Sequence, residues 1–331
     1  MNVDGSRVLV TGGGGFIGSH LVEELVARGC SVRAFVHYNS RSDWGNLEHV
    51  PRKVLQSVEI VPGDIVDPFS VRSAVDGCEV VFHLAALIGI PYSYVAPHSY
   101  VQTNVVGTTN VMEACRQCGV SRVVHTSTSE TYGTARYVPI DEGHPLQGQS
   151  PYSASKIAAD KMAESYHRAF ALPVITVRPF NTFGPRQSAR AVIPTIISQL
   201  LTEAPTLSLG SLTPVRDFTY VKDTVAAFVS VANSDAAIGE VLNVGNGKGI
   251  TIGQLVELIS GLLGRPEVDI VCESYRVRPD LSEVMQLIAS NEHVKRLTGW
   301  EPKWNLTDGL AETIAFIRDH PQLFKPSRYT V

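Results

Sequence analysis

The feature that most constrains this chain is a glycine-rich loop between a short apolar run and a helical pattern near the N-terminus. The run Val8–Val10 is followed by Thr11, by glycines at positions 12, 15 and 18, and by apolar helical positions that start at Phe16. Glycines let the backbone approach a pyrophosphate, and the first turn of a helix offers free N–H groups and a positive dipole end. In this context the loop predicts a dinucleotide-binding site made by Gly12, Gly15, Phe16, Ile17 and Gly18.

Apolar strands alternate with helical stretches over the first 180 residues. Short, continuous apolar runs of this kind indicate a parallel sheet whose two faces are covered by helices. We therefore predict an α/β protein with a Rossmann-type, doubly wound parallel sheet. The expected strands are residues 8–10, 32–36, 58–61, 80–82, 123–124 and 174–177, and the expected helices are residues 68–76, 98–118 and 151–170.

The sequence pattern changes after Pro179, where prolines, glycines and arginines cluster and the expected elements become short and irregular. This change predicts a smaller C-terminal substrate-binding lobe. Residues 1–180 are assigned to the dinucleotide-binding domain, which also takes back a segment of about 215–250 that contains a strand at 241–244. Residues 181–331 are assigned mainly to the substrate lobe.

Composition argues against several classes of protein. The net charge is −4, so the composition does not require a strongly basic surface, and a nucleic-acid partner is not expected. Cys115 and Cys118 have a redox-motif spacing, but they fall near the end of a helix and no second pair completes a zinc site, so no metal site is expected. With no signal peptide and no apolar run that could cross a membrane, the expectation is a cytoplasmic protein without a membrane partner.

The end of the second strand bears on the choice of dinucleotide. A carboxylate commonly binds a ribose hydroxyl there, but this chain has His37, followed by a polar segment with Asn39 and Arg41. An arginine beside hydroxyl groups suits a 2′-phosphate, so NADP is slightly favoured over NAD; the alternative is an exposed loop and NAD bound without the acid. Asp64 and Ile65 are candidates for contact with the adenine, although an ordinary turn explains Asp64 nearly as well.

Tyr152 and Lys156 form a Tyr-x-x-x-Lys pair at the start of the helix expected over residues 151–170. Side chains at this spacing lie on one face of a helix. A phenol titrates near pH ~10, but a neighbouring ammonium and the positive ring of an oxidised nicotinamide favour its phenolate. Tyr152 is therefore a candidate base for a substrate hydroxyl, with both side chains beside the nicotinamide. Taken alone, the spacing also suits a solvated surface pair.

Thr128, Ser129 and Glu130 follow the fifth strand directly. In an open α/β sheet the ligand crevice lies outside the carboxyl ends of the strands, so these side chains are expected to face the substrate. A hydroxyl can bond the reacting oxygen, and a carboxylate can take the proton next to a new ketone. A Ser/Thr-rich turn is the alternative, but it does not account for the glutamate.

Further motifs accompany the glycine loop and the Tyr-x-x-x-Lys pair: His83-Leu84-Ala85-Ala86, Asn104 in Asn-Val-Val-Gly-Thr, Arg178-Pro179-Phe180-Asn181, Gly184-Pro185-Arg186, and Arg216-Asp217-Phe218-Thr219-Tyr220-Val221. Together they make nearly the whole chain resemble the extended short-chain dehydrogenase/reductase family, which modifies nucleotide sugars. The resemblance implies a cofactor contact from Leu84, Ala85 and Ala86. The candidates for substrate binding are Asn104, Asn181, Arg186, Arg190, Arg216 and Arg278. Arginine forks suit phosphate oxygens, while a surface ion pair is the alternative for any one of them, above all for Arg186.

Glu130 bears on the subclass within that family. Family 4-epimerases generally have a non-acidic residue at its position, whereas Ser129-Glu130 is similar to the GDP-mannose 4,6-dehydratases. Residues 38–47, 187–194 and 209–214 look like the 4,6-dehydratases of legionaminic-acid-type pathways, which act on a nucleotide-linked N-acetylglucosamine. The resemblance thus implies a hydro-lyase that acts on a UDP- or GDP-linked N-acetylglucosamine.

By the same resemblance, the reaction has three stages. Tyr152 and the cofactor oxidise C4, Glu130 removes the C5 proton as water leaves from C6, and the hydride returns to C6. The product is a 4-keto-6-deoxy sugar, and the NAD or NADP stays tightly bound because each turnover regenerates it.

Two alternatives stay open. UDP-glucuronate decarboxylases also have Thr-Ser-Glu, so a decarboxylase or a 4-epimerase of the same family is the first. A non-catalytic dinucleotide-binding scaffold or sensor is the second, against which the intact Tyr152, Lys156, Thr128 and Glu130 argue. The resemblance also implies a homodimer in which the helices at 98–118 and 152–170 pair with their copies as a four-helix bundle.

Overall fold

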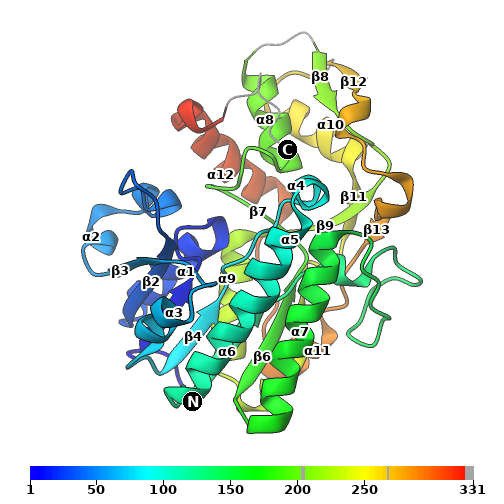
Figure 1. The fold of residues 1–331 in the computed structure, drawn as a ribbon. Helices are drawn as coiled ribbons and strands as arrows, with labels where there is room; N and C mark the ends of the chain where they lie inside the picture. The colour runs from blue at the N-terminus through cyan, green and yellow to red at the C-terminus, as the bar shows by residue number, and fades with distance from the viewer. Residues whose placement is uncertain (203–205, 267, 325–331) are drawn as a thin grey trace.

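A seven-stranded parallel sheet forms the centre of the computed structural model, which describes residues 1–202, 206–266 and 268–324 (Figure 1). Its strand order is β10-β6-β5-β4-β1-β2-β3, so the chain winds outward from β1 in both directions, as the alternation of strands and helices predicts. The strands are β1 (Arg7–Thr11), β2 (Ser31–His37), β3 (Glu59–Gly63), β4 (Val80–His83), β5 (Arg122–Thr126), β6 (Val174–Pro179) and β10 (Val241–Val244). The predicted doubly wound α/β fold is confirmed, and β10 returns to this sheet from the second half of the chain.

Helices cover both faces of the sheet. Successive side chains of a strand point to opposite faces, so Val8 and Val10 pack with Leu21 in one buried cluster while Leu9 packs with Val111 in another. The first face holds α1 (Phe16–Ala27) and α9 (Val221–Ala232), and the second holds α3 (Pro68–Val75), α6 (Gly107–Gln117) and α7 (Pro151–Phe170).

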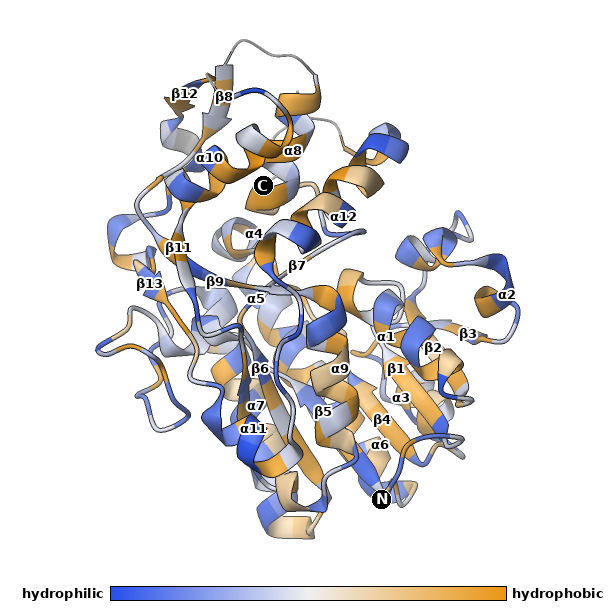
Figure 2. Ribbon diagram, turned by 180° about the vertical axis from the view of Figure 1, so that it is seen from behind, coloured by the Kyte–Doolittle hydropathy of each residue, from blue (hydrophilic) through white to orange (hydrophobic). Residues whose placement is uncertain are grey.

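The C-terminal lobe sits above the carboxyl ends of the sheet strands and is built from two small sheets and three longer helices (Figures 1 and 2). One sheet holds β7 (Asn181–Phe183), β9 (Val215–Tyr220), β11 (Gly249–Thr251) and β13 (Gln286–Leu287), and the other pairs β8 (Thr206–Leu209) with β12 (Asp269–Cys272). The helices are α8 (Val192–Leu201), α10 (Ile252–Leu262) and α12 (Leu306–Asp319). Shorter helices are α2 (Arg52–Leu55), α4 (Ile90–Val95), α5 (Pro97–Tyr100) and α11 (Glu292–Thr298).

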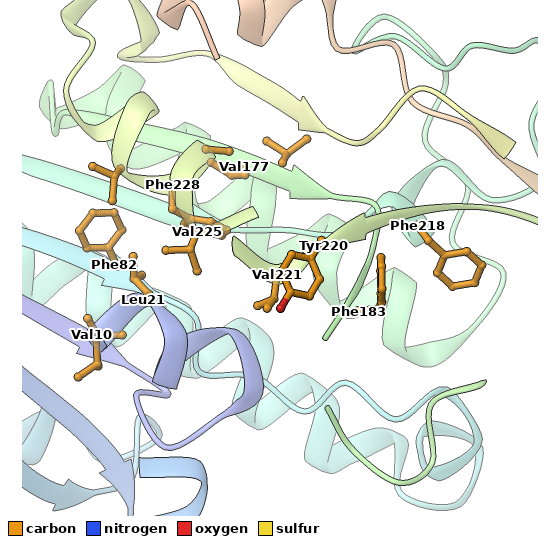
Figure 3. Close-up of a cluster of buried hydrophobic side chains, with 14 of the residues drawn as sticks. Val10, Leu21, Phe82, Val177, Phe183, Phe218, Tyr220, Val221, Val225 and Phe228 are labelled. Carbon is orange, nitrogen blue, oxygen red and sulfur yellow. The ribbon is translucent and has the colours of Figure 1, made fainter. Parts of the chain in front are cut away.

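One continuous apolar core joins the sheet to this lobe (Figure 3). It runs from Val10 and Phe82 in the sheet through Phe228 on α9 to Phe183 and Tyr220 in the small sheet. Helix α9 makes this connection because it directly follows β9 and packs on α1, β5 and β6. The two lobes are therefore parts of one packed unit.

The helix expected over residues 98–118 is present, but it is not α-helical throughout. The structure has α5, then a π-helical segment at Val101–Val106, then α6. Within the π segment Asn104 is buried, and its side chain bonds the backbone of Leu87 and the hydroxyl of Ser155. The wider turn thus accompanies a side chain that serves two other elements, which a helical periodicity does not reveal.

Within residues 1–202, 206–266 and 268–324, no helix combines the length and the hydropathy needed to span a membrane.

Replacing Phe228 by Ala is expected to lower the free energy of unfolding by about 3–5 kcal/mol, because this ring is 0% exposed at the junction of the two lobes and its loss leaves a cavity. Phe69→Ala is the matched control, since that ring is 84% exposed and its removal should change stability by no more than about 0.5 kcal/mol. Chemical denaturation of both variants measures the difference. Equal effects would contradict the assignment of Phe228 to a shared core.

Candidate active site

A cavity of about 1330 Å³ lies where the carboxyl ends of the sheet strands face the C-terminal lobe. Parallel strands end at the same edge of a sheet, so side chains that follow different strands meet there. Residues at or just after the ends of the first six sheet strands line the cavity: Gly12, His37, Asp64, Leu84, Thr128 and Phe180. The opposite wall comes from the lobe and includes Leu209, Pro214 and Ile252.

Most of the predicted site residues line this one cavity, and three do not. Those that line it are Gly12, Gly15, Phe16, Ile17, Gly18, His37, Asn39, Arg41, Asp64, Ile65, Leu84, Ala85, Ala86, Thr128, Ser129, Glu130, Tyr152, Asn181, Arg190, Arg216 and Arg278. Lys156, Asn104 and Arg186 are not among its lining residues.

The glycine loop fits a pyrophosphate. Gly12 has φ +71°, and a Cβ there would lie 2.8 Å from the backbone N of Ala85. A Cβ on Gly18 would lie 2.2 Å from the carbonyl oxygen of Gly12, so neither position tolerates a side chain. Helix α1 starts at Phe16 without a side-chain cap, which leaves the N–H groups of its first turn available to an anion.

Thr11 and His83 tie the glycine loop to the segment after β4. The hydroxyl of Thr11 lies 2.8 Å from Nδ1 of His83 and accepts the N–H groups of Leu84 and Ala85, each at 3.2 Å. Burial lowers the pKa of His83 well below its ordinary value, so the ring is neutral. A neutral ring adds no charge beneath the segment Leu84–Ala86, and it can serve as both hydrogen-bond donor and acceptor.

The polar segment after β2 folds over the glycine loop. The N–H of Asn46 donates to the carbonyl of Gly14 at 2.8 Å, and Oδ1 of Asn39 accepts the N–H of Arg41 at 3.0 Å. Asp43 also lines the cavity, and its carboxylate accepts the N–H of Gly45 at 2.7 Å. Sequence reasoning missed this carboxylate because it stands six residues beyond the strand end where such a group is sought.

Tyr152 projects from the first turn of α7 into the cavity. Ser150 caps this helix in a capping box with Ser153, and Pro151 opens the first turn. Burial raises the pKa of Tyr152 above its ordinary value, a hydrogen bond with Thr128 lowers it, and the charge of Glu130 raises it. The phenol is thus neutral by itself and needs a nearby positive charge to lose its proton. The hydrogen bond makes Thr128 a direct neighbour of the phenol, and Glu130 lines the same cavity.

Lys156 lies beneath the cavity, one helical turn from Tyr152. Its Nζ donates to the carbonyl oxygen of Thr126 at 2.7 Å, and the side chain is buried. Burial lowers the pKa of Lys156 to about 8, while the charge of Asp160 raises it. The ammonium is therefore held against the end of β5, one helical turn along α7 from the phenol.

A cluster of opposite charges lines the cavity around Glu130. Nη1 of Arg278 lies 3.7 Å from Oε1 of Glu130 and 3.9 Å from Oε1 of Glu283, and Nη2 of Arg216 lies 3.3 Å from the same oxygen of Glu283. Burial lowers the pKa of Arg216, an effect that Glu130 and Glu283 oppose. Sequence reasoning found both arginines but missed Glu283, which stands in a segment without periodic pattern.

Asn104 and Arg186 are turned away from the cavity, which corrects their assignment to the substrate. The side-chain amide of Asn104 already bonds the backbone of Leu87 and the hydroxyl of Ser155. Arg186 is buried against α1, where its guanidinium pairs with Glu23 and lies 2.8 Å from Nδ1 of His20. Both side chains connect distant segments. Arg186 thus belongs to an ion pair, but a buried one and not the surface pair of the alternative.

The chain is similar to known proteins over nearly its whole length. The family model described as GDP-mannose 4,6 dehydratase matches residues 9–313. A UDP-glucose 4-epimerase of Mycolicibacterium smegmatis is 34% identical, across 96% of this chain and 100% of that protein.

Two solved structures are also similar. The dTDP-glucose 4,6-dehydratase DesIV of Streptomyces venezuelae, with NAD and TYD bound, has a TM-score of 0.83 at 29% identity, over 97% of this chain and 100% of that one. A UDP-N-acetylglucosamine 4-epimerase of Methanobrevibacter ruminantium, in complex with UDP-N-acetylmuramic acid, has a TM-score of 0.85 at 30% identity, over 95% and 99% of the two chains.

Replacing Gly18 by Ala is expected to weaken dinucleotide binding by more than about tenfold, because the new methyl group would displace the carbonyl of Gly12 and with it the anion-binding turn. Gly261→Ala is the control: this helical glycine has no atom within 4 Å of an added Cβ, so affinity should be unchanged and stability should rise by up to about 1 kcal/mol. Titration calorimetry of both variants with NAD and with NADP measures these affinities. Unchanged affinity in Gly18→Ala would remove the glycine loop from the binding site.

Proposed function

The chain belongs to the GDP-mannose 4,6-dehydratase family, and from that premise we propose that it is a nucleotide-sugar 4,6-dehydratase with an internal nicotinamide cofactor. Glu130 lines the same cavity as Tyr152 and Thr128, and this observation carries the proposal. A dehydratase needs an acid–base pair for oxidation at C4 and a second base for the proton at C5. Tyr152 with Thr128 suits the first requirement, and Glu130 suits the second.

Tyr152 starts the reaction in this proposal. The phenolate takes the proton of the sugar hydroxyl at C4, while Thr128 holds the same oxygen through a hydrogen bond. Positive charge from Lys156, one helical turn away, and from an oxidised nicotinamide when bound would favour the phenolate, which burial alone disfavours. When bound, the nicotinamide dinucleotide accepts a hydride from the sugar and later gives it back.

Glu130 acts once C4 is a ketone. The ketone acidifies the neighbouring C5–H, and the carboxylate of Glu130 takes that proton and gives it to the C6 hydroxyl, which leaves as water. When the hydride returns to C6, C5 is protonated again, and the proton that Tyr152 took from the C4 hydroxyl balances this step. Arg278 lies 3.7 Å from the carboxylate and helps to hold it in place. The product is a 4-keto-6-deoxy sugar, in line with a carboxylate at a position where an epimerase has no use for one.

The residues that would hold the cofactor are the glycine loop, the segment after β4 and the polar segment after β2. We propose NAD, since DesIV is a similar structure with NAD bound. The sequence-based preference for NADP depends on Arg41, which lines the cavity. Asp43 beside it supplies a carboxylate for a ribose hydroxyl, which favours NAD.

The substrate we propose is a UDP- or GDP-linked N-acetylglucosamine. Arg216 and Arg278 suit the diphosphate because both guanidinium groups line the cavity on the lobe side, and Asn181 and Arg190 lie along the same cavity. The acetamido group rests on the resemblance of residues 38–47, 187–194 and 209–214 to enzymes that act on N-acetylglucosamine. A homodimer formed through α6 and α7 and a cytoplasmic location remain predictions.

A 4-epimerase is the second candidate, because a 34% identical relative is named as one. An epimerase uses Tyr152 in the same way but has no role for a base at C5. A uronate decarboxylase would also lack that role, since carbon dioxide leaves in place of the proton. A non-catalytic scaffold would have no need for any of the three cavity side chains Tyr152, Thr128 and Glu130.

Replacing Glu130 by Gln is expected to slow elimination by roughly a hundredfold or more while reduction of the bound cofactor on addition of substrate persists, since only the C5 base is lost. Mass spectrometry follows the loss of water, and nicotinamide absorbance follows the reduction. Tyr152→Phe is the companion variant and should lose both signals. Water loss at the wild-type rate in Glu130→Gln, or recovery of a C4 epimer from the wild type, would refute the dehydratase proposal.

Replacing Arg41 by Ala tests the choice of cofactor. If the guanidinium meets a 2′-phosphate, the variant should lose roughly tenfold in affinity for NADP and stay within about twofold for NAD. Arg52→Ala, an exposed change on the neighbouring α2, is the control for general loss of positive charge. Equal effects on the two dinucleotides would show that Arg41 does not read the 2′ position.

A further inference from the structure

Helix α7 presents three ionisable side chains at intervals of four residues. Tyr152, Lys156 and Asp160 therefore share one face of the helix, and all three are buried, with 7%, 3% and 4% exposed. Only Tyr152 lines the cavity. Asp160 lies two turns below the phenol, in a part of the sheet–helix interface where a carboxylate has no access to water.

Four donor atoms from two strands surround the Asp160 carboxylate. Ser127 Oγ on the β5 side donates at 2.7 Å, His125 Nε2 lies at 3.1 Å, and Arg178 on β6 donates from Nη2 at 2.9 Å and from Nε at 3.3 Å. Burial by itself would raise the pKa of Asp160, but the hydrogen bond with His125 and the charge of Arg178 bring it to about 2. The carboxylate is thus ionised at every physiological pH.

Lys156 depends on this charge. Its ammonium is buried and donates to a neutral backbone carbonyl, that of Thr126. A buried ammonium without a counter-ion loses its proton readily. Asp160, one helical turn farther along α7, provides the negative charge that opposes this loss, and the same carboxylate also holds Arg178 at 2.9 Å.

The network continues from Asp160 to the turn that carries Glu130. Arg178 donates from Nη1 to the hydroxyl of Tyr132 at 3.0 Å, and that hydroxyl donates to Oδ1 of Asn243 at 2.8 Å. Tyr132 is 0% exposed and belongs to the same 3₁₀ turn, Ser129–Tyr132, as Glu130. Arg178 therefore connects Asp160 to the last residue of this turn.

We propose that Asp160 is a positioning residue for both halves of the reaction. Its carboxylate keeps the ammonium of Lys156 charged beneath the phenol, and through Arg178 and Tyr132 it fixes the turn that presents Glu130. The first role applies to any reaction that starts at Tyr152, and the second rests on the proposed function. A residue that only stabilised the fold would affect neither the charge of Lys156 nor the balance between the two steps.

Replacing Asp160 by Asn tests the first role. Lys156 must be protonated for activity, and the loss of a negative charge lowers its pKa, so the limb of the pH profile on which activity falls as pH rises should move to lower pH by about one unit. The acid limb, set by Tyr152, should move the same way, because the charge of Asp160 raises the pKa of that phenol. An unmoved profile with reduced stability would overturn the proposal in favour of a structural role.

Three matched variants separate charge from packing. Asp160→Glu keeps the charge and should leave the alkaline limb where it is in the wild type. Ser127→Ala removes one hydrogen bond to the carboxylate without changing its charge and should do the same. Asp223→Asn removes another buried helical carboxylate, one that accepts the backbone N–H groups of Lys303 and Trp304, and should shift nothing. A limb that moves equally in all four variants would reflect a general loss of packing.

Tyr132→Phe tests the second role and leaves the buried ion pair intact, so it gives a result even if Asp160→Asn does not fold. It should slow elimination by roughly fivefold to tenfold while cofactor reduction stays at the wild-type rate. Equal slowing of both steps, or no change in either, would overturn the link to Glu130.

A readout without turnover separates this proposal from the proposed function. In protein with isotope-labelled lysine, the Lys156 resonance, assigned by its loss in Lys156→Met, should titrate at lower pH in Asp160→Asn than in the wild type. If no nucleotide sugar is turned over, the proposed function fails, but this titration still decides the role of Asp160.

Discussion

The backbone contact between Gly12 and Ala85 is the constraint on which the rest of the structure depends. At this contact the end of β1 and the start of the glycine loop lie directly against the segment after β4. The contact exists only because Gly12 lacks a Cβ and adopts a positive φ. Thr11 and His83 then lock the contact with hydrogen bonds. The floor of the cavity, and thus the orientation of anything that lies on it, follows from this one close approach.

Local sequence pattern predicted the sheet and the centre of the site, and the reason is the same for both. Strands such as 80–82 and 174–177 are short apolar runs, and parallel strands bring the residues that follow them to a shared edge. Thr128, Glu130 and Tyr152 could therefore be placed together before the structure was known. The helix expected over residues 151–170 is Pro151–Phe170 in the structure, where Ser150 caps it and Pro151 stands in its first turn.

Side chains whose partners come from distant segments could not be placed in this way. Asn104 binds Leu87 and Ser155, and Arg186 binds Glu23, so each is explained by tertiary contacts that no periodicity encodes. Glu283 and Asp43 were missed for a related reason. Both belong to irregular segments, where neither a strand end nor a helical register indicates which way a carboxylate points.

The shared apolar core of the two lobes has a consequence for how ligands come and go. In many two-lobed enzymes the halves swing about a hinge because little apolar surface lies between them. Here a swing would pull Phe228 and Val225 away from Tyr220 and Phe183 and expose that surface to water, at roughly 25 cal/mol for each Å². Ligand exchange at the cavity is therefore better served by small displacements at its rim than by a swing of one lobe against the other, so the body of the protein can remain rigid while ligands enter and leave.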